Sequence, residues 1–384
     1  MRFLFCYIFL LCICIQINDA KNPAEPLQKM RNIVRSKRAM ASDFDSLWKT
    51  AVYYRIDPML RNAVLPAIKF WDDNTCIPFI EDENKPNLQF RVVLEYCSSS
   101  LGYRPQGQYV NLTLDCLDFP TIIKLIARAL GVLFEQNRAD RDEYVIINKS
   151  NVNTTIDISS FFDVVKFDEM NGFVSGYDYR SIMHGSGYDY SINGQRTIRT
   201  RDPNYQATIG QIDGPTFADV RNMVRSHCAT LANSTAYCEN GGFFVKNNTK
   251  CYCPPLYTGQ FCESFITVPS NCPSLNVAAT DTFQTVSISG NKKCTVVITA
   301  PGNKQVNFRL TSFNITNNGP IVKKGACLYN YLEVNYRADQ NLSGARLCNT
   351  MVTNITVPRT ESNKLTLTYR GRAGASFSLN YRSI

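Results

Sequence analysis

The chain has 384 residues, of which 44% are hydrophobic and 19% are charged. This composition excludes a disordered or fibrous protein, and the length suits two or three folded units. The formal net charge is +9, but residues 1–38 hold 7 basic and 2 acidic side chains, which leaves +4 for the rest. A nucleic-acid-binding role therefore loses its main support.

The first 20 residues have the features of a secretory signal peptide. One basic residue, Arg2, precedes an apolar run from Phe3 to Ile17, and two polar residues then lead to Ala20. No later stretch has the roughly 18 apolar residues that a membrane-spanning helix requires. We therefore expect residues 1–20 to be removed and the product to be secreted, extracellular and without a membrane span.

A basic cluster at residues 35–38, Arg-Ser-Lys-Arg, resembles the sites that furin-type convertases cut. Cleavage there would make residues 21–38 a short propeptide and Ala39 the mature N-terminus. A solvated basic patch is the alternative interpretation.

The cysteines divide the exported chain into three parts. Three of the 15 cysteines lie in the signal peptide, and the remaining twelve suit six disulfides. The first four are widely spaced, as in a large domain, and the next four are crowded among glycines, as in a small cross-linked module. The last four punctuate a tail whose alternating pattern favours a β-sandwich. In chain order they are Cys76, Cys97, Cys116 and Cys228; Cys238, Cys251, Cys253 and Cys262; and Cys272, Cys294, Cys327 and Cys348.

Eight N-x-S/T sequons are candidate glycosylation sites, and in an exported chain their asparagines are expected to face solvent. They are Asn111, Asn148, Asn153, Asn233, Asn247, Asn314, Asn341 and Asn354.

The clearest helix of the first part is predicted from about Thr121 to Phe134, because apolar residues recur there at a period near 3.6. Lys124 and Arg128 lie one turn apart on the opposite face, where a solvated basic stripe is the ordinary interpretation. The chain has only two histidines, His184 and His227, so no three-histidine metal site can form.

Residues 121–145 resemble the active-site helix and the following turn of the astacin family of zinc metalloproteinases. Further matches extend the similarity to roughly residues 39–228; they are Leu47-Trp48, residues 74–77, a Met-turn-like stretch at 177–184 that contains Met183, Ile209-Gly210-Gln211, and Cys228. The resemblance implies a two-lobed α+β, metzincin-like domain. It also implies disulfides from Cys76 to Cys228 and from Cys97 to Cys116.

Every residue that carries the family's chemistry is replaced. The family uses H-E-x-x-H-x-x-G-x-x-H, in which three histidines bind zinc and the glutamate is the general base. The resemblance places Lys124, Arg128 and Phe134 at the histidines, Leu125 at the base and Gly185 at the Met-turn tyrosine, an additional zinc ligand of the family, whereas Gly131 and Met183 are retained. Two cations and two side chains without lone pairs cannot hold or activate a zinc-bound water. We therefore expect no catalytic residue, no metal ligand and no zinc cofactor.

Glu135 matches the acid that in the family receives the ammonium group of the mature N-terminus, which here would be that of Ala39. An exposed acid among the neighbouring charges is the alternative.

The two C-terminal parts resemble known modules. Residues 229–263 resemble an EGF-like module that lacks two of the usual six cysteines, with Phe244 where one of them is expected. The remaining pairs would be Cys238–Cys251 and Cys253–Cys262. Residues 272–384 resemble a CUB domain, paired Cys272–Cys294 and Cys327–Cys348, with Asn330 in place of a calcium-binding aspartate.

These features favour a secreted, catalytically inactive astacin-like protein that binds extracellular proteins or peptides. An active astacin-type zinc metalloendopeptidase and a structural matrix component are the alternatives. Lys124 and Arg128 could recognise anions in the former substrate groove, unless an internal Asp or Glu neutralises them.

Overall fold

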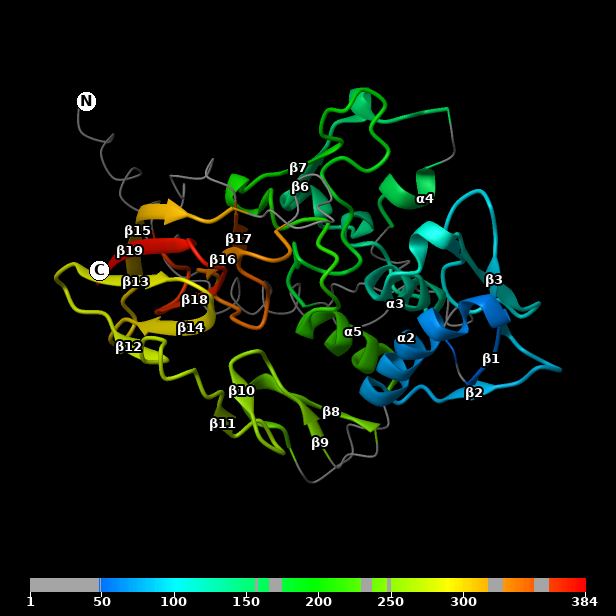
Figure 1. Cartoon of the computed structure of the whole chain (residues 1–384), viewed down its shortest axis with the longest axis horizontal. Coiled ribbons are helices and arrows are strands. Elements are labelled where there is room, and N and C mark those ends of the chain that lie inside the picture. Colours follow the sequence, from blue (N-terminus) through cyan, green and yellow to red (C-terminus); the bar gives the residue numbers. More distant parts are fainter. Residues whose placement is uncertain are drawn as a thin grey trace, which may run out of the picture.

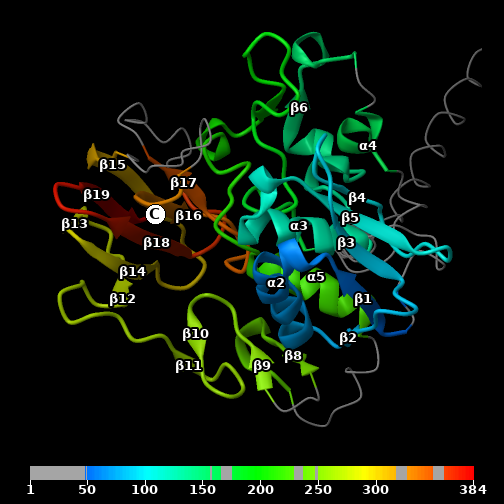
Figure 2. The same cartoon turned by 45° about the vertical axis from the view of Figure 1, so that its right-hand side comes forward.

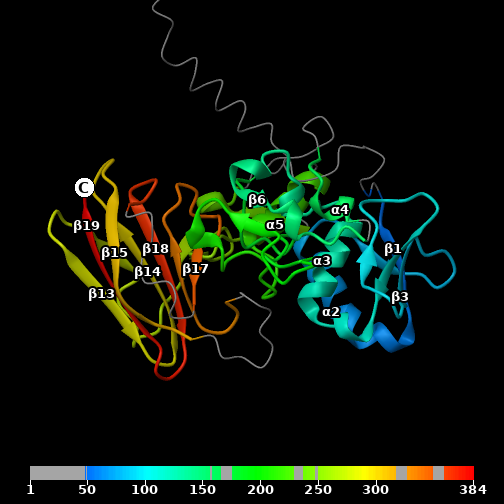
Figure 3. The same cartoon turned by 90° about the horizontal axis from the view of Figure 1, so that it is seen from above.

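The computed structural model of the chain describes residues 48, 50–155, 158–165, 175–228, 237–246, 250–316, 327–348 and 359–384. The expected signal peptide and propeptide, residues 1–20 and 21–38, lie outside these ranges. The described parts form an N-terminal sheet lobe, a central helical region and a C-terminal sandwich, in that order along the longest axis (Figures 1 and 3). No helix in the described ranges is long and apolar enough to cross a bilayer.

The N-terminal lobe is a five-stranded sheet covered by helices. The sheet order is β2 (Phe79–Glu81), β1 (Val52–Ile56), β3 (Leu88–Val92), β5 (Gln108–Leu112) and β4 (Ser98–Ser99). Only the edge strand β4 runs antiparallel to its neighbour. Alternate residues of β1 are buried, and they belong to the same core as the apolar faces of α2 (Arg61–Asn74) and α3 (Phe119–Ala129).

The helix α3 is displaced toward the N-terminus relative to the sequence prediction of Thr121 to Phe134. The Asp118 side chain accepts a hydrogen bond from the backbone of Thr121, so the helix begins before Pro120, which fits its first turn. The helix ends at Ala129 because Gly131 adopts a left-handed φ of 98°. Phe134 therefore lies beyond the helix, on the turn that follows.

The rest of the first domain has short elements and two disulfides. The strands β6 (Val145–Ile147) and β7 (Ile198–Thr200) pair; α4 (Ser159–Phe162) lies between them in the chain, and α5 (Phe217–His227) follows β7. Cys76–Cys228 joins the ends of α2 and α5, and Cys97–Cys116 lies beside β4. The 3-10 turns are Pro58–Leu60, Leu114–Cys116, Glu135–Asn137, Arg141–Glu143, Lys149–Asn151, Pro203–Tyr205 and, in the next module, Glu239–Gly241.

The small second module has two short hairpins. They pair β8 (Phe243–Val245) with β9 (Lys250–Tyr252) and β10 (Tyr257–Thr258) with β11 (Ser264–Phe265). The disulfides are Cys238–Cys251 and Cys253–Cys262, and the buried ring of Phe244 packs against them. The Phe244 ring thus lies where the six-cysteine framework of EGF-like modules would have its third disulfide. Below α5 in Figure 1, this module packs its Phe243 and Tyr252 rings on Phe217.

The C-terminal part is a β-sandwich, as expected for a CUB-type domain. One sheet has the order β12 (Asn276–Ala278), β14 (Lys292–Thr299), β18 (Lys364–Gly371), β16 (Tyr331–Asn335) and β17 (Ala345–Leu347). The other has the order β13 (Gln284–Ser289), β19 (Ser376–Ser383) and β15 (Val306–Asn314). Cys272–Cys294 and Cys327–Cys348 are both formed. The six disulfides join the same cysteines that spacing and resemblance paired.

The sandwich and the first domain share one hydrophobic core. Tyr205 stacks on Tyr179 at 4.3 Å between ring centroids and meets Tyr336 of the sandwich edge-on at 5.7 Å. The Tyr336 hydroxyl donates to Asp202, and Arg337 donates to the carbonyl oxygen of Tyr177 at 2.6 Å. The helical centre therefore adjoins the sandwich directly, as Figure 2 also shows.

A buried arginine in the sandwich completes this contact. The Arg346 guanidinium binds Glu333 of its own sheet at 2.9 Å and Asp213 of the first domain at 2.7 Å. Burial alone would raise the pKa of Asp213, but the charges of Arg346 and Arg180 outweigh it and hold that pKa below its ordinary value. Asp213 is therefore ionised at neutral pH, and the network joins two domains through paired charges.

We expect Arg346→Met to destabilise both domains together. The change leaves Glu333 and Asp213, whose side chains are 19% and 20% exposed, as neighbouring acids without their cation. Breaking a fully buried pair costs about 3–5 kcal/mol, which is an upper limit for these partly exposed carboxylates. Scanning calorimetry should show a lower melting temperature, partly restored by adding Asp213→Asn. The exposed pair Lys304–Asp281 is the control, since Lys304→Met should leave the melting temperature unchanged. Unchanged melting of Arg346→Met would contradict the network's role.

Candidate functional site

The site inherited from the family resemblance lies where α3 meets the turn at Met183. Met183 is buried, and its carbonyl oxygen accepts a hydrogen bond from the backbone of Glu135. Asp219 of α5 holds this turn, because its carboxylate accepts from the Ser181 hydroxyl and from the backbone of Ile182 at 2.9 Å. The turn that underlies a metal site in the family is thus built and held by hydrogen bonds.

Arg128 is buried rather than solvated. Its side chain points from α3 onto the ring of Phe134, with the guanidinium carbon 4.3 Å from the ring centroid, and the residue is 9% exposed. Burial lowers the pKa of Arg128 to about 10, so the group stays charged at neutral pH. The expected solvated basic stripe is therefore wrong at this residue, because the turn after Gly131 folds Phe134 back over it.

Lys124 is half-buried one turn earlier on the helix. Its ammonium group donates to the carbonyl oxygen of His184 at 3.4 Å and lies 5.2 Å from the Phe134 ring centroid. A cavity of about 40 Å³ beside it is also lined by Ser186, Asp189 and Gln211. Lys124 and Arg128 thus put two cations around one aromatic ring.

Leu125 and Gly185 stand at the two remaining replaced positions. Leu125 is buried in the core of the N-terminal lobe, where it offers no group that could accept a proton. A Cβ placed on Gly185 would lie 2.6 Å from Cζ of Phe161. Phe161 therefore occupies the space that a tyrosine side chain at residue 185 would need.

Phe161 belongs to an aromatic cluster that fills the inherited site. Its ring lies 5.1 Å from Phe134, 4.9 Å from Phe162 and 4.8 Å from Tyr190, measured between centroids. Sequence reasoning missed this cluster because Phe161 and Phe162 lie about 30 residues beyond α3 in a segment without a periodic pattern. Only the local alignment of the replaced ligands could have indicated the region.

The residues at this place do not fit a zinc ion. A guanidinium and an ammonium group repel a dication, and the Phe134 ring has no lone pair to donate. Within the described ranges, no group of three His, Cys, Asp or Glu side chains is arranged to hold a metal. The chemistry of the side chains therefore gives zinc no coordination at the inherited position.

His184 is hydrogen-bonded on both sides of its ring. Nδ1 lies 2.7 Å from the carbonyl oxygen of Gly185, which can only accept, so Nε2 accepts from the Tyr177 hydroxyl at 2.8 Å. Burial lowers the pKa of His184 to about 4. His227 is half-buried, with Nδ1 3.2 Å from the Met223 carbonyl oxygen, and loss of solvent around the ring lowers its pKa to about 4. Both rings are thus neutral at neutral pH.

Glu135 is 5% exposed, so the alternative of an exposed acid is wrong. Its Oε1 accepts from Arg138 at 2.9 Å and from the backbone of Asp178 at 2.9 Å. Burial raises the pKa of Glu135 to about 7, against the opposing charge of Arg138. Ala39, whose ammonium group the resemblance assigns to Glu135, lies outside the described residues, so that role stays a prediction.

Five of the eight sequons fall within the described residues. Asn314 is exposed, whereas Asn111, Asn148, Asn153 and Asn341 are half-buried. Asn111 uses both ends of its amide, since Oδ1 accepts from Arg91 and Nδ2 donates to Ser98. Asn233, Asn247 and Asn354 lie outside the described residues, and occupancy of all eight stays a prediction.

Asn330, the residue in place of a calcium-binding aspartate, is buried in the sandwich. Its Nδ2 donates to the carbonyl oxygen of Thr316 at 2.8 Å. The amide is neutral, so it supplies none of the negative charge that favours calcium.

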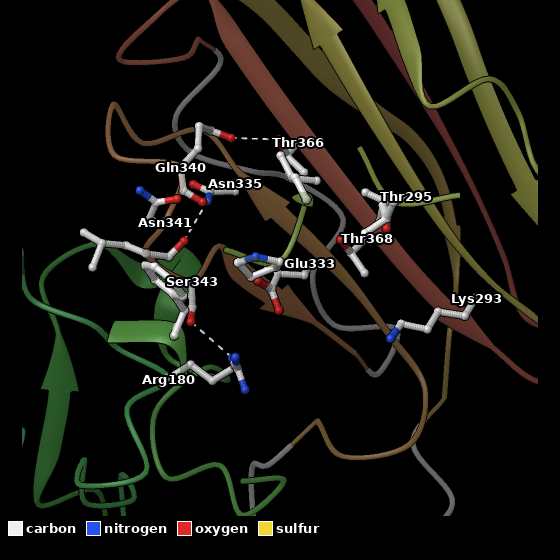
Figure 4. Close-up of a pocket in the computed structure, with 15 residues that line it drawn as sticks. Arg180, Lys293, Thr295, Glu333, Asn335, Gln340, Asn341, Ser343, Thr366 and Thr368 are labelled. Atoms are coloured by element: carbon white, nitrogen blue, oxygen red, sulfur yellow. Dashed lines mark hydrogen bonds between the residues drawn. The ribbon is translucent and has the colours of Figure 1, made fainter. Parts of the chain in front are cut away.

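The cavity that the sequence did not indicate lies between the three modules. Its volume is about 140 Å³, and its walls come from Arg180 and Phe217 of the first domain, Leu256 of the small module, and Glu333 and Gln340 of the sandwich. In Figure 4 Arg180 points to Ser343, and Gln340 reaches Thr366. The first of these hydrogen bonds joins the first domain to the sandwich, and the second lies within the sandwich.

The family model for astacin, a family of peptidases, matches residues 40–228. The zinc metalloproteinase nas-34 of Caenorhabditis elegans is 35% identical over 91% of this chain and 58% of its own length. The zinc metalloproteinase nas-23 of the same organism is 33% identical over 75% of this chain and 55% of its own length. The chain thus spans a little over half the length of these relatives.

Among solved structures, high choriolytic enzyme 1 (HCE-1), a hatching enzyme zinc-protease from Oryzias latipes, is 29% identical, with a TM-score of 0.40. That similarity covers 47% of this chain and 94% of that one. The family match over residues 40–228, together with the nematode relatives, shows that this chain belongs to the astacin family of peptidases.

Proposed function

We propose that this chain is a secreted, catalytically inactive member of the astacin family that acts by binding extracellular proteins or peptides. The observation that carries the proposal is the arrangement at the inherited zinc position. There the Arg128 guanidinium lies on the Phe134 ring, and Phe161 fills the space beside Gly185. Cleavage by the family's chemistry needs a metal ligand set and a proton acceptor, and these side chains provide neither.

The domain has other sources of stability than a metal. Cys76–Cys228 and Cys97–Cys116 each restrict the unfolded chain, which typically contributes about 2–4 kcal/mol per disulfide. Met183 and α3 belong to one extensive buried core. The inherited fold can therefore persist without zinc and serve as a binding surface.

The disulfides and the attached modules support an extracellular role. Six disulfides form readily only in an oxidising compartment, and the resemblance of the two C-terminal parts to EGF-like and CUB modules favours a binding role. The relatives named zinc metalloproteinases make an active enzyme the competing proposal, and the metal content of the purified protein distinguishes the two.

Purified protein is expected to contain far less than one zinc per molecule, measured by elemental analysis after dialysis against zinc-containing buffer. The matched variant carries Lys124→His, Arg128→His and Phe134→His, and we expect zinc in that variant only, because three imidazoles restore the ligand types. Near-stoichiometric zinc in the unaltered protein, together with chelator-sensitive cleavage of an unfolded protein substrate, would favour the active enzyme.

Gly185→Tyr should destabilise the domain by about 1–3 kcal/mol, because the new side chain meets Phe161 in a filled space. Urea denaturation is the measurement, and Phe161→Ala in the same chain should remove most of that additional cost. Phe162→Ala is the control, since Phe162 is the adjacent ring and is not among the atoms nearest Gly185. Equal rescue by both alanines would refute the role assigned to Phe161.

His184 should make the protein less stable in acid. Its pKa is about 4 when folded and about 6.5 when unfolded, so its contribution is complete above pH 6.5 and is lost as the pH falls toward 4. Over that window the stability of wild-type protein should fall more steeply than that of His184→Asn, by at most about 1.4 kcal/mol per pH unit. His227→Asn should show the same difference. Identical slopes for all three proteins would mean that these rings are not desolvated and neutral.

A further inference from the structure

Arg128 differs from the other buried arginines of this protein in the partners of its guanidinium. Arg138 binds Glu135 and Asp140, and Arg346 binds Glu333 and Asp213. By contrast, Nη1 of Arg128 is enclosed and has no hydrogen-bond partner, and the ion pairs recorded among the described residues do not include Arg128. The internal acid that could have neutralised Arg128 is therefore not found in the described ranges.

An enclosed cation without a counter-charge lowers the stability of a fold. The desolvation penalty for a buried ion is several kcal/mol, whereas stacking on an aromatic ring returns about 0.5–2 kcal/mol. The Phe134 ring therefore does not offset the burial of Arg128. Arg138 and Arg346 each bind two carboxylates. The Arg128 guanidinium binds none among the described residues, so its N–H donors can still bind an anion.

The groups around Arg128 indicate what kind of ligand could bind to it. Lys124 adds a second positive charge one helical turn away, and Phe134 forms an apolar wall. Tyr190 is close enough for its phenol to act on the charge of Arg128, and it interacts in turn with Tyr96. Tyr190 is 43% exposed and Tyr96 is 68% exposed, so this side of Arg128 leads to solvent.

Tyr190 is the partly exposed neighbour on this side of Arg128. Its backbone has a left-handed φ of 56°, a conformation that non-glycine residues adopt at a cost, and its ring packs edge-on against Phe161 and Phe162. The site considered below requires this ring to turn toward solvent, so that a ligand can reach Nη1.

We propose that Arg128 is the anchor of a carboxylate-binding site, and that an extracellular peptide or protein inserts one carboxylate beside Tyr190 to pair with this guanidinium. A planar guanidinium matches a planar carboxylate through two parallel hydrogen bonds, and the aromatic walls suit the apolar stem that carries the carboxylate. The ligand's carboxylate comes from a Glu or Asp side chain or from a C-terminus. This proposal rests on the proposed function, because the site occupies the position of the lost zinc ligands.

The test is calorimetric titration of the full secreted protein with three decapeptides of one backbone sequence. The first has a central Glu and a C-terminal amide, the second has Gln and an amide, and the third has Gln and a free C-terminal carboxylate. We expect the first or the third to bind at least about tenfold more tightly than the second, which separates a side-chain carboxylate from a terminal one.

Two variants assign the effect to Arg128. Arg128→Met keeps an apolar side chain on Phe134 and should abolish the preference for the carboxylate. Arg91→Met is the matched control and should keep it, because Arg91 also stacks on a ring, that of Tyr109 at 3.8 Å, but is exposed. Equal binding of all three peptides by wild-type protein, or an unchanged preference in Arg128→Met, would overturn the proposal.

The melting temperature without peptide gives a second criterion. Arg128→Met removes an uncompensated charge and should melt no lower than wild-type protein. A fall of several degrees would show that Arg128 is a structural residue and would overturn the proposal. Zinc is measured in the same samples, so zinc-free protein without a carboxylate preference rejects this site and leaves the proposed function standing.

Discussion

The stacking of the Arg128 guanidinium on the Phe134 ring is the interaction on which the functional interpretation of this structure depends. It occupies the place where the family's chemistry requires metal ligands, and it forms because Gly131 ends α3 and turns the chain back toward the helix. The same glycine serves the metal site in the family resemblance. One backbone feature thus supports two different chemistries, and the side chains on either side of it decide which one is possible.

The frame around this position is kept although its chemical groups are exchanged. Asp219 still holds the turn at Met183, Glu135 still lies buried under it, and Cys76–Cys228 still joins α2 to α5. These contacts stabilise the fold, whereas zinc ligands stabilise it only when the metal is present. Replacement of the ligand residues therefore leaves in place the contacts that hold the helices together.

The sequence predicted the fold class and the cysteine pairs, because its motifs and cysteine spacing resemble those of known families. It placed α3 five residues too far at its C-terminus, since apolar residues continue past Gly131 with the same period although the backbone does not. It could not predict the burial of Arg128, because a periodic pattern describes one helix and says nothing of the turn that folds over it. Two contacts join segments that are distant in the sequence: Phe161 packs against Gly185, and Arg346 of the sandwich pairs with Asp213 of the first domain. Local sequence patterns carry no signal for such contacts.

The continuous core from Tyr179 through Tyr205 to Tyr336 has a mechanical consequence. Domains joined by an exposed flexible linker reorient independently. A molecule that binds both domains must then restrict that motion, which costs entropy. Here the interdigitated rings already hold the astacin domain and the sandwich at one separation and one angle. A partner that contacted both domains would therefore meet two surfaces whose spacing is already set, and only a molecule of matching span would gain from both at once.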